Sequence, residues 1–189
     1  MAVDPEMVEA LQASGAFLDG HFQLSSGRHS DRYIEKFNLL QWPPYTELVC
    51  RKMAEWGREY RPETVAGPTT GGVVLAYEVG RQLGLRGIFA ERDPEGGRSF
   101  QRGFALRPGE RVMVVDDITS TGEAVFDTIE AVRKAGGEAV CACVIADRSG
   151  GTIDFGLPFF STTDLTIEMQ TWTPDECPLC REGVPLKVT

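Results

Sequence analysis

Lysine, histidine and long apolar runs are scarce in this sequence. Its 189 residues include four Lys and two His, and the net charge is −9. An acidic chain is a poor general ligand for nucleic acid, because such binding depends on neutralising phosphates. No apolar run approaches the roughly 20 residues that a membrane-spanning helix needs, and the acidic first residues lack the basic start of a signal peptide. We therefore expect a cytoplasmic protein that binds neither nucleic acid nor membranes.

Arginine, by contrast, is plentiful and unevenly placed. Of fifteen Arg, seven fall between Arg81 and Arg111. Guanidinium groups bind carboxylates and phosphates through paired hydrogen bonds. An acidic protein that concentrates Arg in one segment is expected to hold a small polyanion there. The length suits one domain with a small appendage.

The usual phosphate-binding sequences are also missing. Neither Gly-x-x-x-x-Gly-Lys-Ser/Thr nor Gly-x-Gly-x-x-Gly occurs, which excludes the common nucleoside triphosphate and dinucleotide motifs. Instead, residues 112–115 are an apolar, β-branched run typical of a strand buried in a parallel sheet. Asp116 and Asp117 follow it, then a polar loop and a helical pattern that opens near Glu123. A helix start attracts phosphate and paired carboxylates accept hydrogen bonds from vicinal hydroxyls, so the segment predicts a sugar-phosphate site.

Residues 114–124, Val-Val-Asp-Asp-Ile-Thr-Ser-Thr-Gly-Glu-Ala, resemble the phosphoribosyl diphosphate (PRPP) motif of the type I phosphoribosyltransferases. A plain strand, acidic turn and helix cap would explain neither the paired acids nor the run of hydroxyls. In that family the two acids meet the ribose 2- and 3-hydroxyls and the following loop holds the 5-phosphate. Mg²⁺ bridges the diphosphate and the sugar, with no protein ligand that we can name. The resemblance implies PRPP binding by Asp116, Asp117, Ile118, Thr119, Ser120, Thr121, Gly122, Glu123 and Ala124.

A second strand, loop and helix begins at residues 65–66. The loop Gly-Pro-Thr-Thr-Gly-Gly, residues 67–72, offers backbone amides to an anion. It resembles the family's diphosphate loop, which implies that Thr69, Thr70 and Gly71 contact PRPP. Taken alone, the same residues describe any tight turn between a strand and a helix.

The polar stretch of residues 91–102 is long for a connection and has little periodicity. These features favour a mobile functional loop, and a solvated charge run is the alternative. Family members have such a loop at this place, which often closes over the neighbouring subunit's reacting centre in a dimer. The resemblance therefore implies a homodimer with Arg92, Arg98 and Arg102 acting in trans on the leaving diphosphate. The Lys and His that orotate enzymes usually carry in this loop are missing here.

Residues 17–36 read as short strands around Asp-Gly and Ser-Gly turns. They resemble the amino-terminal segment of the orotate phosphoribosyltransferases, which forms a hood over the base. Ser25 stands where many members carry Lys, and Tyr33 begins the aromatic pair. The resemblance implies that Ser25 and Tyr33 contact orotate; an amphipathic hairpin that only caps the sheet is the alternative.

Arg148 follows another predicted buried strand, residues 138–145. In a right-handed parallel arrangement it reaches the same edge of the sheet as Asp116. In orotate phosphoribosyltransferases an Asp-Arg at the matching place grips the carboxylate of orotate, which implies orotate binding by Arg148 with Ser120 against the ring. The alternative is a surface Arg in a salt bridge.

Five Cys remain. Cys50, Cys141 and Cys143 have apolar neighbours and read as small core residues. Cys177 and Cys180 form a single Cys-x-x-Cys, which is half of a zinc site, and neither a second pair nor a nearby His completes it in the sequence. We expect a structural turn here; a redox pair or a zinc shared between subunits are the alternatives.

Together these features predict an α/β protein with the type I phosphoribosyltransferase fold. We expect a mainly parallel sheet flanked by helices, with a core over about residues 40–150 and a hood built from about 15–36 and 155–189. The resemblance implies an orotate phosphoribosyltransferase that uses PRPP, orotate and Mg²⁺. The alternatives are a purine phosphoribosyltransferase and a regulator that senses PRPP without turnover.

Overall fold

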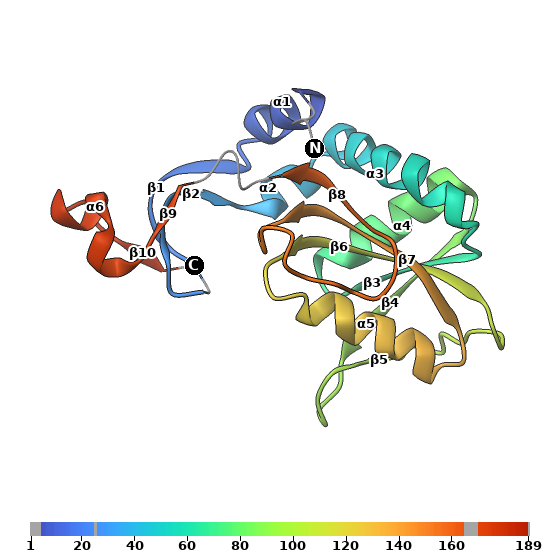
Figure 1. Cartoon of the computed structure of the whole chain (residues 1–189). Coiled ribbons are helices and arrows are strands. Elements are labelled where there is room, and N and C mark those ends of the chain that lie inside the picture. The colour runs from blue at the N-terminus through green and yellow to red at the C-terminus, as the bar shows by residue number, and fades with distance from the viewer. Residues whose placement is uncertain (1–4, 25, 165–169, 189) are drawn as a thin grey trace.

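The computed structural model describes residues 5–24, 26–164 and 170–188. These residues form a larger body and a smaller projection, each built around its own sheet (Figure 1). None of the helices in the described ranges combines the length and hydrophobicity needed to cross a bilayer.

The sheet of the larger body has six strands in the order β5-β4-β3-β6-β7-β8. All neighbouring strands are parallel except β5, which runs antiparallel to β4 at one edge. The predicted mainly parallel sheet is confirmed. The strands are β3 (Thr64–Pro68), β4 (Arg86–Arg92), β5 (Arg98–Phe100), β6 (Arg111–Thr119), β7 (Glu138–Asp147) and β8 (Phe159–Asp164).

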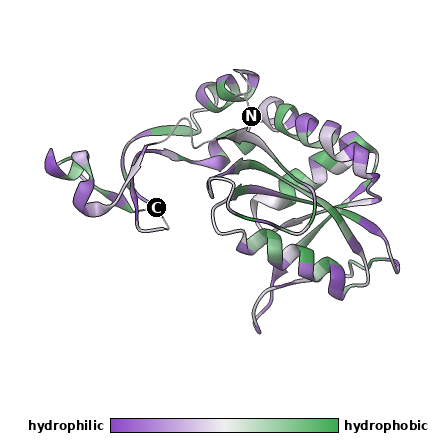
Figure 2. Cartoon of the chain, viewed as in Figure 1, coloured by the Kyte–Doolittle hydropathy of each residue, from purple (hydrophilic) through white to green (hydrophobic). Residues whose placement is uncertain are grey.

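Helices cover both faces of this sheet. On one face, residues of α1 (Pro5–Ala13), α3 (Pro43–Gly57) and α4 (Gly71–Leu83) pack in one hydrophobic cluster with Met113 and Val115. On the other, α5 (Glu123–Lys134) packs in a second cluster with the alternate residues of β6. Because side chains of a strand alternate between faces, the unbroken apolar run of β6 is buried on both, as its sequence predicts. Figure 2 shows the hydrophobic residues running through these central strands.

The smaller sheet takes its strands from both ends of the chain, in the order β10-β1-β2-β9. We call this sheet, together with the segment between β9 and β10, the hood. Its strands are β1 (Phe17–Gln23), β2 (His29–Ile34), β9 (Thr171–Trp172) and β10 (Lys187–Val188). The 3₁₀ turn Pro174–Glu176 and α6 (Pro178–Arg181) lie between the last two strands, and α2 (Lys36–Leu40) joins β2 to the body; a second 3₁₀ turn, Arg58–Tyr60, follows α3.

Two predicted boundaries differ from the structure. The hood was expected to include everything after about residue 155, but β8 pairs with β7 in the central sheet. The reason is that Phe159 and Phe160 point to opposite faces, where each joins a different hydrophobic cluster of the body. The expected loop of residues 91–102 is largely a hairpin, since Arg92 pairs with Arg98 across β4 and β5.

Candidate functional site

Two strand-to-helix loops meet at the carboxyl edge of the central sheet. β3 and β6 are neighbours and run in the same direction, so their loops to α4 and α5 leave from the same edge. Ligands of open α/β sheets bind at this kind of edge. Both predicted PRPP segments are therefore brought together by the fold.

Each loop lines a cavity, and the two cavities share Arg98, Asp116, Ile118 and Ala124. The one over the β6 loop, here the phosphate cavity, is completed by Arg92, Thr119, Ser120, Thr121, Gly122, Glu123 and Asp127. The one over the β3 loop, here the diphosphate cavity, is completed by Lys36, Phe37, Pro68, Thr69, Thr70, Gly71 and Asp117. All twelve PRPP residues predicted from the sequence line one cavity or both.

The two acids are nearly inaccessible to solvent, with Asp116 5% and Asp117 6% exposed. The backbone N–H of Asp117 donates to Asp116 Oδ1 at 2.8 Å, and that of Ile118 donates to Asp117 Oδ1 at 2.6 Å. These bonds fix the two carboxylates side by side at the end of β6. Lys36, at the start of α2, lies 3.3 Å from Asp117 Oδ1 through its Nζ.

Asp116 has no cation within ion-pair distance in the described part of the chain. Burial, followed by the charge of Asp117, raises the pKa of Asp116 to about 7. Such a carboxyl gains from any ligand that supplies hydroxyl donors or positive charge. The ionised carboxylate of Asp116 therefore does not stabilise the fold.

Small residues let the diphosphate loop approach the acids. A Cβ on Gly71 would lie 2.0 Å from Asp117 Oδ2, and one on Gly67 would lie 2.2 Å from the carbonyl oxygen of Gly72. Any side chain at Gly71 would push the carboxylate out of place. Glycine is thus required here for close approach of two loops, beyond the flexibility that the sequence suggests.

The phosphate loop turns directly into α5. Gly122 adopts a φ of +81°, in the left-handed region that favours glycine, and α5 starts at the next residue. Ser120, Thr121 and Glu123 are exposed, while Thr119 is buried at the end of β6. Hydroxyls and the positive end of a helix therefore face one cavity, which suits a phosphate.

The three predicted loop arginines have different surroundings. Arg92 and Arg98 line the phosphate cavity of their own chain. Arg98 is 7% exposed and donates to Thr69 Oγ1 and to the Ala90 carbonyl at 3.2 Å. Its buried Nε has no hydrogen-bond partner among the described residues. Burial, and then the charge of Arg92, lowers the pKa of Arg98. Two cationic side chains thus line one cavity.

Arg102 is not part of either cavity. It lies beyond β5, exposed, and binds both carboxylate oxygens of Glu91 at 2.9 Å. The pKa of Glu91 is lowered, mainly by this hydrogen bond. The structure therefore separates Arg102 from Arg92 and Arg98, which lie close to it in the sequence.

Arg148 stands beside the phosphate loop, at the place the strand order predicts. Its backbone N–H donates to the Thr119 carbonyl at 2.8 Å, and its half-buried side chain donates to no group of the described chain. Burial lowers the pKa of Arg148, and the nearby Tyr33 of the hood opposes this. Among the described residues, Arg148 forms no salt bridge. The alternative of a surface Arg in a salt bridge is therefore not observed.

The remaining predicted base contacts come from two segments. Tyr33 lies on β2 and packs against Phe22, with 5.6 Å between ring centroids. Ser120 is exposed in the phosphate loop. Ser25 lies outside the described residues.

Four cavity residues were not predicted: Lys36, Phe37, Pro68 and Asp127. Pro68 lies in the predicted diphosphate loop, next to Thr69. Lys36 is the last residue of the segment Tyr-Ile-Glu-Lys, which begins at Tyr33. The chain has only four Lys, and this rarity is the signal that could have identified Lys36. Phe37 and Asp127 belong to helices whose facing side only the fold defines.

The site also suits a magnesium ion carried by a substrate. Mg²⁺ binds oxygen ligands, often one or two carboxylates together with phosphates. Asp116 and Asp117 supply buried carboxylates that face the cavities, and one ammonium group, Lys36, is within ion-pair distance of the pair in the described residues. The pair therefore leaves negative charge that a divalent cation can neutralise.

The comparisons with known proteins agree with this geometry. A model of the phosphoribosyl transferase domain matches residues 38–175. An orotate phosphoribosyltransferase of Heliobacterium modesticaldum is 45% identical over 182 residues, or 95% of this chain and 94% of the relative. One from Caldanaerobacter subterraneus is 49% identical over 167 residues, or 88% of this chain and 86% of the relative. The crystal structure of orotate phosphoribosyltransferase from Aeropyrum pernix matches with a TM-score of 0.71 and 28% identity, over 85% of this chain and 94% of that one. The chain therefore belongs to the phosphoribosyltransferase family and, within it, to the orotate phosphoribosyltransferases.

Proposed function

We propose that this enzyme transfers the 5-phosphoribosyl group from PRPP to orotate, which yields orotidine 5-phosphate and diphosphate. The observation that carries the proposal is the buried pair Asp116 and Asp117 between two anion cavities. The extended similarity to orotate enzymes supports the choice of base.

The reaction sets two demands on the site. When diphosphate leaves the anomeric carbon, an oxocarbenium-like sugar forms, as in glycoside transfer. The enzyme must hold the sugar and the attacking nitrogen in line and stabilise negative charge on the leaving group. Little general-base catalysis is needed, because orotate is already an anion.

We assign these tasks by position. The acid pair accepts the ribose hydroxyls, and the loop from Thr119 to Ala124 holds the 5-phosphate at the start of α5. Thr69, Thr70 and Gly71 offer polar groups to the diphosphate, and Arg98 lies where it can contact both ends of PRPP because it lines both cavities. Bound Mg²⁺ would neutralise charge on the diphosphate, held through Asp116 and Asp117.

Arg148 and the hood select the base in this proposal. The half-buried guanidinium of Arg148 donates two parallel hydrogen bonds to a planar carboxylate. Tyr33 and Ser120 border the ring. A purine base has no carboxylate and would leave this cation without a partner.

One assay tests the function. Purified protein is incubated with Mg²⁺ and PRPP, and with orotate, uracil, adenine, hypoxanthine or xanthine in turn. We expect diphosphate to be released only when the added base is orotate. Turnover of a purine would support a purine phosphoribosyltransferase, whereas PRPP binding without turnover of any base would support a regulator.

The assembly we propose is a homodimer in which the hairpin of residues 91–102 serves the neighbouring site. The position of Arg102 outside its own cavities supports a role in trans. Arg92 and Arg98 line the cavity of their own chain, so we limit the trans role to Arg102. The expected cytoplasmic location stays a prediction, which fractionation of the source cells would test.

A further inference from the structure

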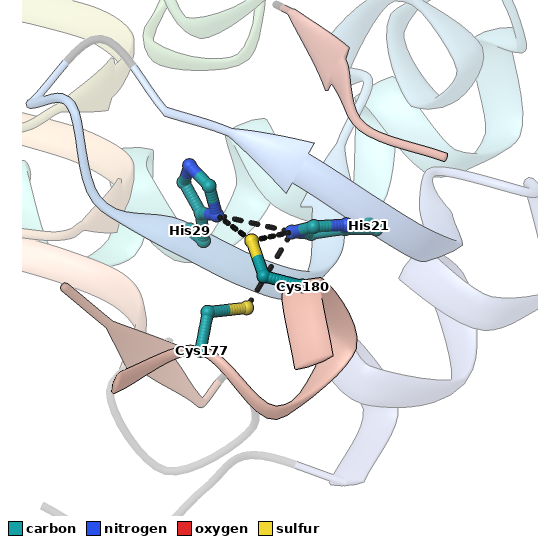
Figure 3. Close-up of side chains that lie close together, drawn as sticks. All are labelled: His21, His29, Cys177 and Cys180. Carbon is teal, nitrogen blue, oxygen red and sulfur yellow. Dashed lines mark hydrogen bonds between the residues drawn. The ribbon is translucent and has the colours of Figure 1, made fainter. Parts of the chain in front are cut away.

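The hood contains a cluster of four side chains that the proposed function does not use. His21 and His29 come from β1 and β2, and Cys177 and Cys180 come from the segment around α6 (Figure 3). The expectation that no His lies near the Cys pair is wrong, because the fold brings both histidines of the chain to it. None of the four residues lines the phosphate cavity or the diphosphate cavity.

A bulge in the hairpin places the two histidines on the same face. Asp19 pairs with Arg32, but Phe22 pairs with Ser30, so β1 holds one extra residue between these pairs. With regular pairing His21 would stand opposite residue 30, on the other face from His29. Bulges of this kind redirect a side chain.

The C-terminal segment then crosses that same face. β9 pairs beside His29, since His29 lies opposite Trp172, and β10 pairs beside β1, where Phe22 lies opposite Lys187. The chain between these two edges passes over the hairpin and carries Cys177 and Cys180. Cys177 is fully buried, His21 is 2% exposed and His29 is 4% exposed.

The ligand atoms converge on one point. His21 Nε2 lies 3.0 Å from His29 Nδ1, 3.4 Å from Cys177 Sγ and 3.7 Å from Cys180 Sγ, and Cys180 Sγ lies 3.2 Å from His29 Nδ1. All four ligand atoms lie within 4.8 Å of one another. Around a tetrahedral zinc ion, ligand nitrogens are about 3.3 Å apart and nitrogen and sulfur about 3.6 Å, given the usual bond lengths. The four nitrogen–nitrogen and nitrogen–sulfur distances above, 3.0–3.7 Å, are close to those of such a tetrahedron.

The second ring nitrogen of His21 is held as in many metal-binding histidines. Its Nδ1 lies 2.8 Å from the carbonyl oxygen of Val184, which can only accept, so Nδ1 carries the proton. This hydrogen bond selects the tautomer in which the lone pair of Nε2 is directed into the cluster. Metal-binding His commonly donate the other ring N–H to a carbonyl in this way. One lone pair cannot satisfy three neighbouring groups by hydrogen bonding alone, whereas a cation satisfies all four.

We propose that His21, His29, Cys177 and Cys180 bind one structural zinc ion that ties the C-terminal segment to the hood hairpin. Two thiolates and two imidazoles in tetrahedral arrangement select Zn²⁺. With four protein ligands the ion has no open position for a substrate, so its role is structural.

A zinc ion would stabilise a segment of the hood that does not pack in the hydrophobic clusters of the body. Neither hydrophobic cluster of the body contains a residue of β9, β10 or α6 within the described chain, and Figure 1 shows α6 at the far end of the projection. Small units that cannot bury enough apolar surface are commonly stabilised by a metal. Metal binding there contributes directly to folding.

The test is metal analysis of the untagged protein, made under reducing conditions, given excess Zn²⁺ and then desalted. We expect about one zinc ion per chain for the wild type and less than about 0.1 for Cys177→Ser/Cys180→Ser, because serine is a poor zinc ligand. The control is Arg28→Ala, which removes the bonds of Arg28 to Thr171 and leaves all four ligands. This control should keep about one zinc ion per chain.

A second measurement does not depend on any variant. Co²⁺ added to the metal-free wild type should give the strong visible bands of a tetrahedral site with thiolate ligands, and Zn²⁺ should abolish them. Lack of zinc binding under reducing conditions would overturn the proposal, as would equal zinc in the double variant. Octahedral Co²⁺ spectra, without thiolate bands, would also overturn it.

Discussion

Lys36 of the hood junction and Asp117 of the central sheet form an ion pair, with 3.3 Å between Lys36 Nζ and Asp117 Oδ1. The pair joins the start of α2 to the end of β6, and both residues line the diphosphate cavity. The position of the hood is thus coupled to the acid that the ribose would meet. An ammonium group at this point can also contact the substrate's phosphates.

We therefore expect Lys36→Met to lower kcat/KM for PRPP at least about tenfold, because a charge-assisted contact contributes about 1.5–3 kcal/mol. Initial rates at varied PRPP measure this. The matched control is Lys134→Met, at the exposed end of α5 and outside both cavities. Equal effects of the two substitutions would mean that Lys36 acts only through net charge.

Replacing both acids should remove PRPP binding and preserve the fold. Asp116→Asn/Asp117→Asn keeps the shape of the side chains, but in each residue an NH2 donor replaces one acceptor oxygen and the charge that balances a cation is lost. Calorimetry with PRPP and Mg²⁺ should show affinity reduced by at least about 100-fold, as expected for the loss of two charged contacts. Unchanged affinity would show that Asp116 and Asp117 do not bind PRPP.

The raised pKa of Asp116 predicts a stability that depends on pH. An ordinary Asp titrates near 4, and burial raises the pKa of Asp116 to about 7. Between these values the folded protein holds a proton that the unfolded chain releases. The contribution of this group to the free energy of unfolding therefore falls as pH rises from about 4 to about 7.

Asp116→Asn removes this cost, so we expect the variant to be more stable than the wild type. The difference in Tm should be larger at about pH 8 than at about pH 5, where the wild-type carboxyl is largely protonated. A gain of about 3–8 °C at the higher pH corresponds to about 1–3 kcal/mol for a chain of this length. Thermal unfolding without ligands measures it, and a variant destabilised equally at both pH values would contradict the assignment.

The sequence alone predicts the body of the fold well. The strand at 112–115 and the helix near Glu123 are recognisable because each is a continuous segment with its own period. Most residues that line the two cavities are predictable for the same reason, since they lie together in two loops. The residues of one strand-loop-helix unit can be assigned from the sequence without knowing which other units pack against it.

Features that depend on distant segments are not predictable in this way. His21 and Cys180 are far apart in the sequence, and a bulge decides which face of the hairpin His21 occupies. Likewise, Lys36 becomes a site residue only because the hood places it beside Asp117. The hairpin of β4 and β5 pairs over too few residues to give a recognisable strand pattern in a polar segment. The predicted hood boundary is wrong because Phe159 and Phe160 pack in the two hydrophobic clusters of the body.

The separation of Arg98 from Arg102 leads to a subunit-mixing prediction. Arg102→Ala subunits are mixed with Asp116→Asn/Asp117→Asn subunits, and exchange is verified. If Arg102 acts in trans, a mixed dimer has one complete site, and random pairing should restore about a quarter of wild-type activity.

The same mixture made with Arg98→Ala should recover nothing, because Arg98 lines the cavity of its own chain. This second mixture is the control for exchange artefacts. Recovery with Arg98→Ala but not with Arg102→Ala would reverse the two assignments. No recovery with either would show that each subunit serves its own site.

The last prediction concerns the choice of base. Arg148 is half-buried, donates through its side chain to no described group, and is held beside Thr119 by its own backbone N–H. A charged contact with a planar carboxylate there should contribute about 1.5–3 kcal/mol, or roughly ten- to two-hundred-fold in binding. Arg148→Ala should therefore lower kcat/KM for orotate at least about tenfold and leave PRPP affinity nearly unchanged.

Two further variants separate the carboxylate contact from other effects of Arg148. Arg148→Lys should rescue only part of the loss, because an ammonium group cannot form two parallel hydrogen bonds. Arg133→Ala, on the exposed side of α5, removes the same charge outside both cavities and should leave orotate kinetics unchanged. Steady-state rates at varied orotate, with calorimetry for PRPP, measure both substrates separately. If Arg148→Ala weakens PRPP binding and spares orotate, Arg148 belongs to the phosphate cavity, and selection of the base must depend on the hood.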